Sequence, residues 1–261
     1  MFDQLLDQTR LLTYFFVVIR VGGILFTAPI FSGNMIRPTV RMGISIMIAS
    51  VIYPFVPPVP FTAEFDVLFL ILQIFKELLI GIAVGTMTGV LFSGVQMGGY
   101  LLDFQMGFSM VNVMDPNTGG QFSYMSQVQN VMLMLIFIAI GGPGLILQAI
   151  SYSYTVLPTG NFEFHTNAFL YAVQLFGQIF IIAITLTAPP LIVLMASNAV
   201  MGVLARIIPQ INLMVVGFPI KIAVGLLIFV LSLQYFYVAF EKVAMNYFRY
   251  IREFMNLYGG R

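Results

Sequence analysis

The feature that most constrains this chain is the length of its stretches without a charged residue. No Asp, Glu, Lys or Arg stands between Asp115 and Glu163, and none stands between Glu163 and Arg206. Charged residues make up 8% of the 261 residues, whereas soluble domains carry about 25%. A chain with so few charged residues has more apolar surface than a single soluble domain can keep out of water. The sequence therefore predicts a polytopic membrane protein, or a subunit buried inside a membrane complex.

Apolar segments separated by proline and glycine breaks give the expected organisation. Six of them span about residues 11–31, 42–57, 67–101, 127–150, 168–200 and 213–240. Most approach the roughly 20 residues that a helix needs to cross a bilayer. A transmembrane β-barrel would alternate apolar and polar residues, and these segments do not alternate. We therefore expect an all-α fold of long, kinked helices arranged as membrane-type hairpins.

Composition excludes several functional classes. The net charge of +1 provides no basic face for nucleic acid. Without cysteine, and with the single histidine His165, the chain has no zinc-thiolate or iron–sulfur site, and we expect no metal and no cofactor. Asp3 and Asp7 have the spacing of a magnesium clamp but no second acidic cluster to complete it. We therefore expect no enzyme, and an intramembrane enzyme or a secondary transporter subunit remain the alternatives.

Three glycines in segment 67–101 predict close helix packing. Gly81, Gly85 and Gly89 recur every four residues and so lie on one helix face. Small residues at this spacing let two helix backbones approach closely inside a membrane. The partner helix belongs either to the same chain or to another subunit.

Charged residues inside the apolar segments are candidates for buried pairs or for a subunit interface. They are Arg20, Lys76, Glu77 and Asp103. Each would cost about 2.5–3.5 kcal/mol at the centre of a bilayer, so such side chains normally face protein or water. Because adjacent residues on a helix point about 100° apart, Lys76 and Glu77 each require a separate partner.

Methionine and phenylalanine dominate the segment that follows Asp103. Met106, Met110 and Met114 recur every four residues around Phe108, and Asp115-Pro116 then break the run. Such flexible, polarizable side chains can fill an irregular gap and still deform. The segment is therefore either a plug loop that seals a cavity or an ordinary connector with methionine filler.

A second break follows the long apolar segment 168–200. It contains Arg206, Pro209, Gln210 and Asn212, and Lys221 follows. The prolines and basic ends predict a bent turn between two helices, whose charged groups bond a neighbouring subunit or backbone carbonyls. After Phe240 the chain becomes amphipathic, which suits either lipid headgroups or a docked partner.

An ordered set of motifs over nearly the whole chain resembles the FliR family of flagellar type III export gates. The set comprises Arg20-Val21-Gly22, Ala28-Pro29-Ile30-Phe31, the run from Lys76 to Gly81, the pattern from Gly98 to Phe108, Asp115-Pro116, Arg206-x-x-Pro209-Gln210-x-Asn212 and Gly217-Phe218-Pro219-x-Lys221. Injectisome export subunits of the SctT type share much of this set.

The resemblance implies a non-enzymatic subunit of the bacterial inner membrane, located in the flagellar basal body. With FliP and FliQ it would form the channel through which unfolded flagellar proteins are secreted, with FlhB and FlhA as further partners. Residues 1–165 would correspond to a FliP-like part that includes a plug loop at about 105–123. Residues 166–261 would correspond to a FliQ-like helical hairpin with an amphipathic C-terminal end. An injectisome export subunit is the alternative reading.

Overall fold

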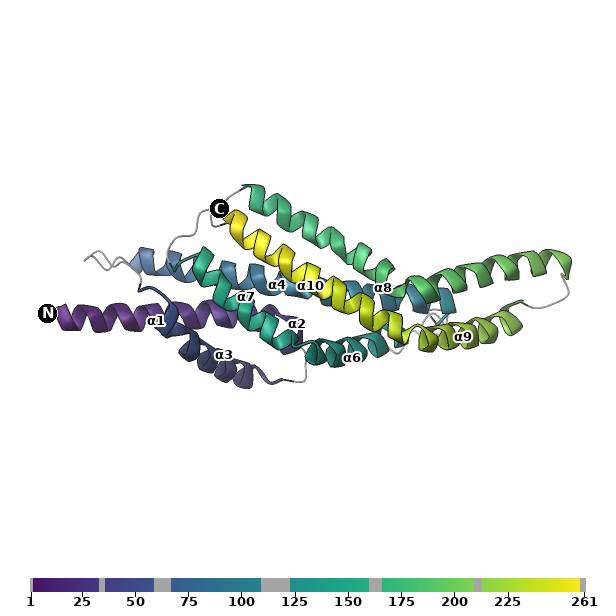
Figure 1. The fold of residues 1–261 in the computed structure, drawn as a ribbon, viewed down its shortest axis with the longest axis horizontal. Coiled ribbons are helices and arrows are strands. Elements are labelled where there is room, and N and C mark those ends of the chain that lie inside the picture. Colours follow the sequence, from purple (N-terminus) through teal and green to yellow (C-terminus); the bar gives the residue numbers. More distant parts are fainter. Residues whose placement is uncertain are drawn as a thin grey trace. The chain divides into compact units, whose positions relative to one another are not determined.

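The computed structural model describes residues 2–32, 36–58, 67–108, 123–159, 166–208 and 213–258. All regular elements in these ranges are helices (Figure 1). They are α1 (Phe2–Thr27), α2 (Pro29–Ser32), α3 (Pro38–Ile52), the short 3₁₀ helix η1 (Tyr53–Phe55), α4 (Val67–Met106), α6 (Tyr124–Ala139), α7 (Gly142–Val156), α8 (Thr166–Ile207), α9 (Leu213–Leu231) and α10 (Leu233–Tyr258). The all-α prediction is confirmed.

The chain divides into two compact units, and neither is continuous in sequence. Unit 1 contains residues 1–90, 141–176 and 246–261, and unit 2 contains residues 91–140 and 177–245. Helices α4, α8 and α10 therefore each contribute to both units. The division of the chain near residue 165 is predicted from resemblance to other subunits, not from compact units, and it stays a prediction.

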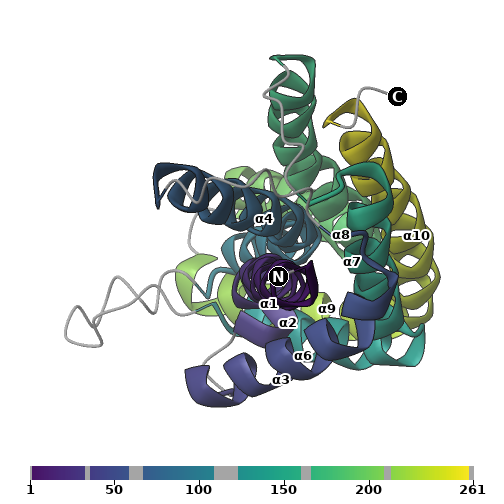
Figure 2. The same ribbon diagram turned by 90° about the vertical axis from the view of Figure 1, so that its left-hand side faces the viewer.

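In unit 1, helix α1 is the central element. Helix α3 packs against it, and the first half of α4 runs alongside it in both views (Figures 1 and 2). The α1 side chains in this core are fully buried, among them Phe16, Val17, Val21, Ile24 and Leu25. A transmembrane-type helix is thus enclosed by protein on much of its surface.

In unit 2, the core forms around the last turns of α4. It consists of Leu102 and Met106 from α4, Met125 from α6, Leu194 from α8 and Phe229 from α9. Partly buried apolar residues surround it, including Phe108 and Met132. Methionine thus supplies two of the five central side chains, as expected where irregular gaps must be filled.

Among the described residues, four helices are long and apolar enough to cross a membrane, and the number rises to six if each of two bent helix pairs counts as one span. This agrees with the six predicted segments. A break separates α6 from α7, because Gly141 adopts a left-handed conformation with φ 75° and ends α6. Pro143 then stands in the first turn of α7, where its missing N–H costs nothing.

The pair α9–α10 is bent by 59° at Ser232, although no glycine or proline stands there. The Ser232 hydroxyl donates to the Phe229 carbonyl over 2.9 Å, and its own N–H is shared between the Ile228 and Phe229 carbonyls. A serine side chain that bonds the preceding turn weakens helix continuity. This explains a bend that the apolar pattern did not reveal.

Candidate functional site

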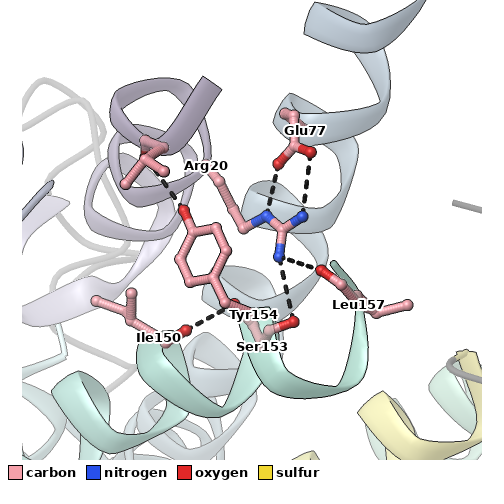
Figure 3. A network of polar contacts seen from close by, with 7 residues as sticks. Arg20, Glu77, Ile150, Ser153, Tyr154 and Leu157 are labelled. Atoms are coloured by element: carbon pink, nitrogen blue, oxygen red, sulfur yellow. Dashed lines mark hydrogen bonds and ion pairs between the residues drawn. The ribbon is translucent and has the colours of Figure 1, made fainter. Parts of the chain in front are cut away.

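The most buried charged group of unit 1 is a pair between α1 and α4. Arg20 is 0% exposed and Glu77 is 1% exposed. The Arg20 guanidinium donates from Nε to Oε2 of Glu77 over 2.6 Å and from Nη2 to Oε1 over 3.1 Å. Figure 3 shows this two-bond geometry, which is the strongest arrangement available to an arginine and a carboxylate.

The remaining arginine nitrogen caps helix α7. Arg20 Nη1 donates to the carbonyls of Ser153 at 3.2 Å and Leu157 at 2.8 Å, two acceptors in the last turn of α7 and just beyond it (Figure 3). These carbonyls carry the negative end of the helix dipole. The Tyr154 ring lies 4.2 Å from the guanidinium carbon, and its hydroxyl donates to the Val17 carbonyl over 3.2 Å. Arg20 therefore joins α1, α4 and α7.

The glycines of α4 bring its backbone close to α1. A methyl group at Gly81 would lie 2.6 Å from the Arg20 carbonyl oxygen, and one at Gly85 would overlap the Thr27 hydroxyl. A methyl group at Gly89 would make an ordinary van der Waals contact with Pro29, at 3.7 Å from its Cγ. Glu77 stands one helical turn before Gly81 on the same face, so this close approach also sets the distance between Glu77 and Arg20.

In unit 2, the end of α4 is fixed by a glycine cap. Gly107 has φ 88°. Its N–H donates to the Phe104 carbonyl, and the N–H of Phe108 donates to the Asp103 carbonyl. This is the Schellman pattern of helix termination. Helix α4 therefore extends through Gln105 and Met106, and these first residues of the predicted plug loop are helical.

Asp103 connects this helix end to α6. Its Oδ1 accepts the N–H of Met125 over 3.0 Å, and Ser123 Oγ accepts the N–H of Ser126 over 3.1 Å. Two of the free N–H groups at the start of α6 are thereby satisfied. The carboxylate of Asp103 is buried at the positive end of the α6 dipole, where a negative charge is stabilised.

A groove of about 450 Å³ lies in unit 2 between α4, α8 and α9. It is lined by Phe104, Gln105, Gly107, Asn198, Met201, Gly202, Gly217, Phe218 and Lys221. Asn198 Nδ2 donates to Gln105 Oε1 over 2.7 Å across one wall. The Lys221 ammonium lies 5.9 Å from the centre of the Phe218 ring.

The structure therefore brings some of the predicted residues together and separates others. Arg20 and Glu77 meet, whereas Lys76, partly exposed, is not part of their pair. Met106 and Phe108 belong to the unit 2 core or its rim. Arg206 is exposed in the last turn of α8. Seven predicted residues lie outside the described part of the chain: Met110, Met114, Asp115, Pro116, Pro209, Gln210 and Asn212.

Several residues of these contacts were not foreseen from the sequence. Arg20 bonds the backbone carbonyls of Ser153 and Leu157. Every residue has such a carbonyl, so no sequence pattern indicates this role. Asn198 is a polar residue inside an apolar run, a signal that was available. Within the described ranges, no group of three or more His, Cys, Asp or Glu residues could hold a metal ion.

Comparison with known proteins identifies the family. Residues 11–247 match the model of the bacterial export proteins, family 1. The chain is 30% identical to the flagellar biosynthetic protein FliR of Bacillus subtilis, over 94% of this chain and 95% of that protein. It is 30% identical to FliR of Escherichia coli, over 82% of this chain and 81% of that protein. It is 29% identical to the Yop proteins translocation protein T of Yersinia pestis, over 87% of each chain. The chain is therefore a member of the bacterial export proteins, family 1.

Proposed function

We propose that this protein is a subunit of a flagellar type III export gate. In this proposal it forms, with FliP and FliQ, the channel through which unfolded flagellar proteins leave the cell, and FlhB and FlhA are further neighbours. It has a structural role and no catalytic site of its own. The observation that carries the proposal is the family match over residues 11–247, together with likeness to FliR over most of both chains.

The exposed apolar surface supports a place in a membrane assembly. Long helices carry large apolar side chains at their surface, for instance Phe180, Ile184, Ile192, Val203 and Ile207 on α8. A protein with this much exposed apolar surface would aggregate in water, so lipid or partner subunits must cover these side chains. In this proposal the complex resides in the bacterial inner membrane, at the flagellar basal body.

Deletion of the gene from its own bacterium tests the proposal. We expect loss of flagellar filaments and of secreted flagellar proteins, with both restored by the plasmid-borne chain. An affinity-tagged copy should co-purify with FliP and FliQ from detergent-solubilised membranes. Normal filaments in the deletion strain would refute the flagellar function.

An injectisome export subunit is the second candidate, because the Yersinia pestis translocation protein T matches over 87% of this chain. The two functions differ in the proteins exported. If the deletion abolishes secretion of virulence proteins and leaves motility intact, the injectisome assignment replaces the flagellar one.

The plug role of the segment Gln105–Ser123 forms part of the same proposal. Its described beginning is consistent with an apolar seal, because Met106 is fully buried and Phe108 packs against the core that contains Met125. An apolar constriction blocks ions by excluding water, while thioether and phenyl groups can still deform around a passing chain.

A further inference from the structure

Helix α8 passes through two adjacent prolines, Pro189 and Pro190, without ending. Proline has no N–H, so Pro189 cannot donate to the carbonyl of Thr185, its normal partner one turn earlier. Such positions are where helices bend, and α8 changes direction partway along its length (Figure 1).

The carbonyl that Pro189 leaves free has another partner. The Tyr235 hydroxyl of α10 donates to the Thr185 carbonyl over 2.9 Å. Tyr235 stands three residues after Ser232, the site of the 59° bend between α9 and α10. One hydrogen bond thus joins the break in α8 to the break between α9 and α10.

Between these two breaks lies a helical arm. We define the arm as residues 191–208 of α8 and 213–231 of α9. The arm meets the end of α4 through polar and apolar contacts: Asn198 bonds Gln105, Gly225 abuts the Met106 side chain, and Phe218 packs over Gly107. Leu194 and Phe229 of the arm also share the unit 2 core with Leu102 and Met106.

We propose that the α8–α9 arm is a hinged body that the Tyr235–Thr185 hydrogen bond holds closed against the end of α4. The hinges are Pro189-Pro190 on one side and Ser232 on the other. When the bond opens, the arm swings at both breaks, and its contacts with the end of α4, the core contacts of Leu194 and Phe229 included, loosen together.

The physical basis is the placement of the bond. The interior of a helix resists bending because each carbonyl there accepts a hydrogen bond within the helix. A movement of the arm that bends the chain only at its two breaks would disturb few of these hydrogen bonds. Pro189 and Pro190 each leave a carbonyl of α8 without its helical donor, and the carbonyl of Thr185 accepts instead from a side chain of another helix. The closed position therefore depends on a group that a single substitution removes.

The absence of cysteine from the chain allows a direct measurement. Met106 is 0% exposed and is covered by the arm, so Met106→Cys reacts with a membrane-permeant maleimide only when the arm opens. With fast reclosing, the labelling rate is proportional to the open fraction. The experiment uses membranes of cells that express the full chain with its native partners.

Tyr235→Phe removes only the hydroxyl. We expect labelling of Met106→Cys to accelerate roughly two- to tenfold, the range for loss of one neutral hydrogen bond. Tyr237→Phe is the matched control, since Tyr237 is 42% exposed against 43% for Tyr235. Among the described residues, the Tyr237 hydroxyl has no hydrogen-bond partner. Equal rates in Tyr235→Phe and Tyr237→Phe would overturn the proposal.

Two further variants separate a hinge from general loosening. Pro189→Ala restores an N–H that can bond the Thr185 carbonyl, so Tyr235→Phe should have little effect in that background. Val95→Cys, also 0% exposed on α4 and remote from the arm contacts, should label equally slowly with or without the Tyr235 hydroxyl. Full acceleration in the Pro189→Ala background, or equal acceleration at Val95→Cys, would refute the hinge.

Discussion

Arg20 and Glu77 stand 57 positions apart in the sequence, and the Nε of one lies 2.6 Å from the Oε2 of the other. The contact is possible because Gly81, one turn beyond Glu77, lets α4 approach α1 at backbone distance. The charged residue and the glycine thus act together, and neither explains the packing of α1 against α4 without the other.

Replacing Arg20 by methionine should destabilise unit 1 strongly. Glu77 would remain buried without a partner, and breaking a buried pair in this way costs about 3–5 kcal/mol. The double variant Arg20→Met/Glu77→Leu should recover much of the loss, because no charge is left buried. Denaturant titration of the purified complex measures both effects.

Lys76→Met is the control for this series, because Lys76 is partly exposed and lies outside the buried pair. We expect it to change stability by less than about 1 kcal/mol. A double variant no more stable than Arg20→Met would contradict the account of the buried pair.

Gly81→Ala should disrupt the packing of α1 on α4, since the added methyl group would lie 2.6 Å from the Arg20 carbonyl oxygen. Gly22→Ala provides the comparison, because no atom lies within 4 Å of a methyl group placed there. The amount of folded protein in membranes, measured by limited proteolysis, should fall for the first variant only. Similar protease resistance of both variants would show that α1 and α4 do not pack closely at Gly81.

Asp103→Ala should weaken the start of α6. Loss of the bond to the Met125 N–H removes a cap, and such losses cost about 0.5–2 kcal/mol. Asp103→Asn keeps an acceptor and should retain most of the stability. Hydrogen exchange of the first turn of α6 checks this: exchange should be faster in the alanine variant and nearly unchanged in the asparagine variant. Equal exchange in both variants would argue against a capping role.

The proposed plug role predicts that removal of residues 110–119 makes cells leaky to small ions while export continues in part, because a dry apolar seal would block ions by excluding water. Membrane conductance of cells with the complete gate, with and without the deletion, is the measurement. Assembly is monitored by co-purification of the partner subunits. Unchanged conductance in a normally assembled complex would mean that the segment is only a connector.

The sequence by itself determined the class of this protein. Long intervals without charge require membrane-type helices, because backbone groups and apolar side chains leave few other structures in lipid. The order of the motifs from Arg20 to Lys221 was sufficient to indicate the export family, which the match over residues 11–247 confirms. The spacing of Gly81 and Gly85 predicted close packing, and the pattern left open whether the partner was the same chain.

Only the tertiary structure decided which groups meet. The partner of Arg20 could not be derived from local spacing, because Glu77, Ser153 and Leu157 are distant in sequence and two of them contribute backbone oxygens. The Ser232 bend and the Tyr235–Thr185 bond were likewise hidden. Periodicity records which face of a helix is apolar, whereas hydrogen bonds between helices depend on how those helices are arranged in space.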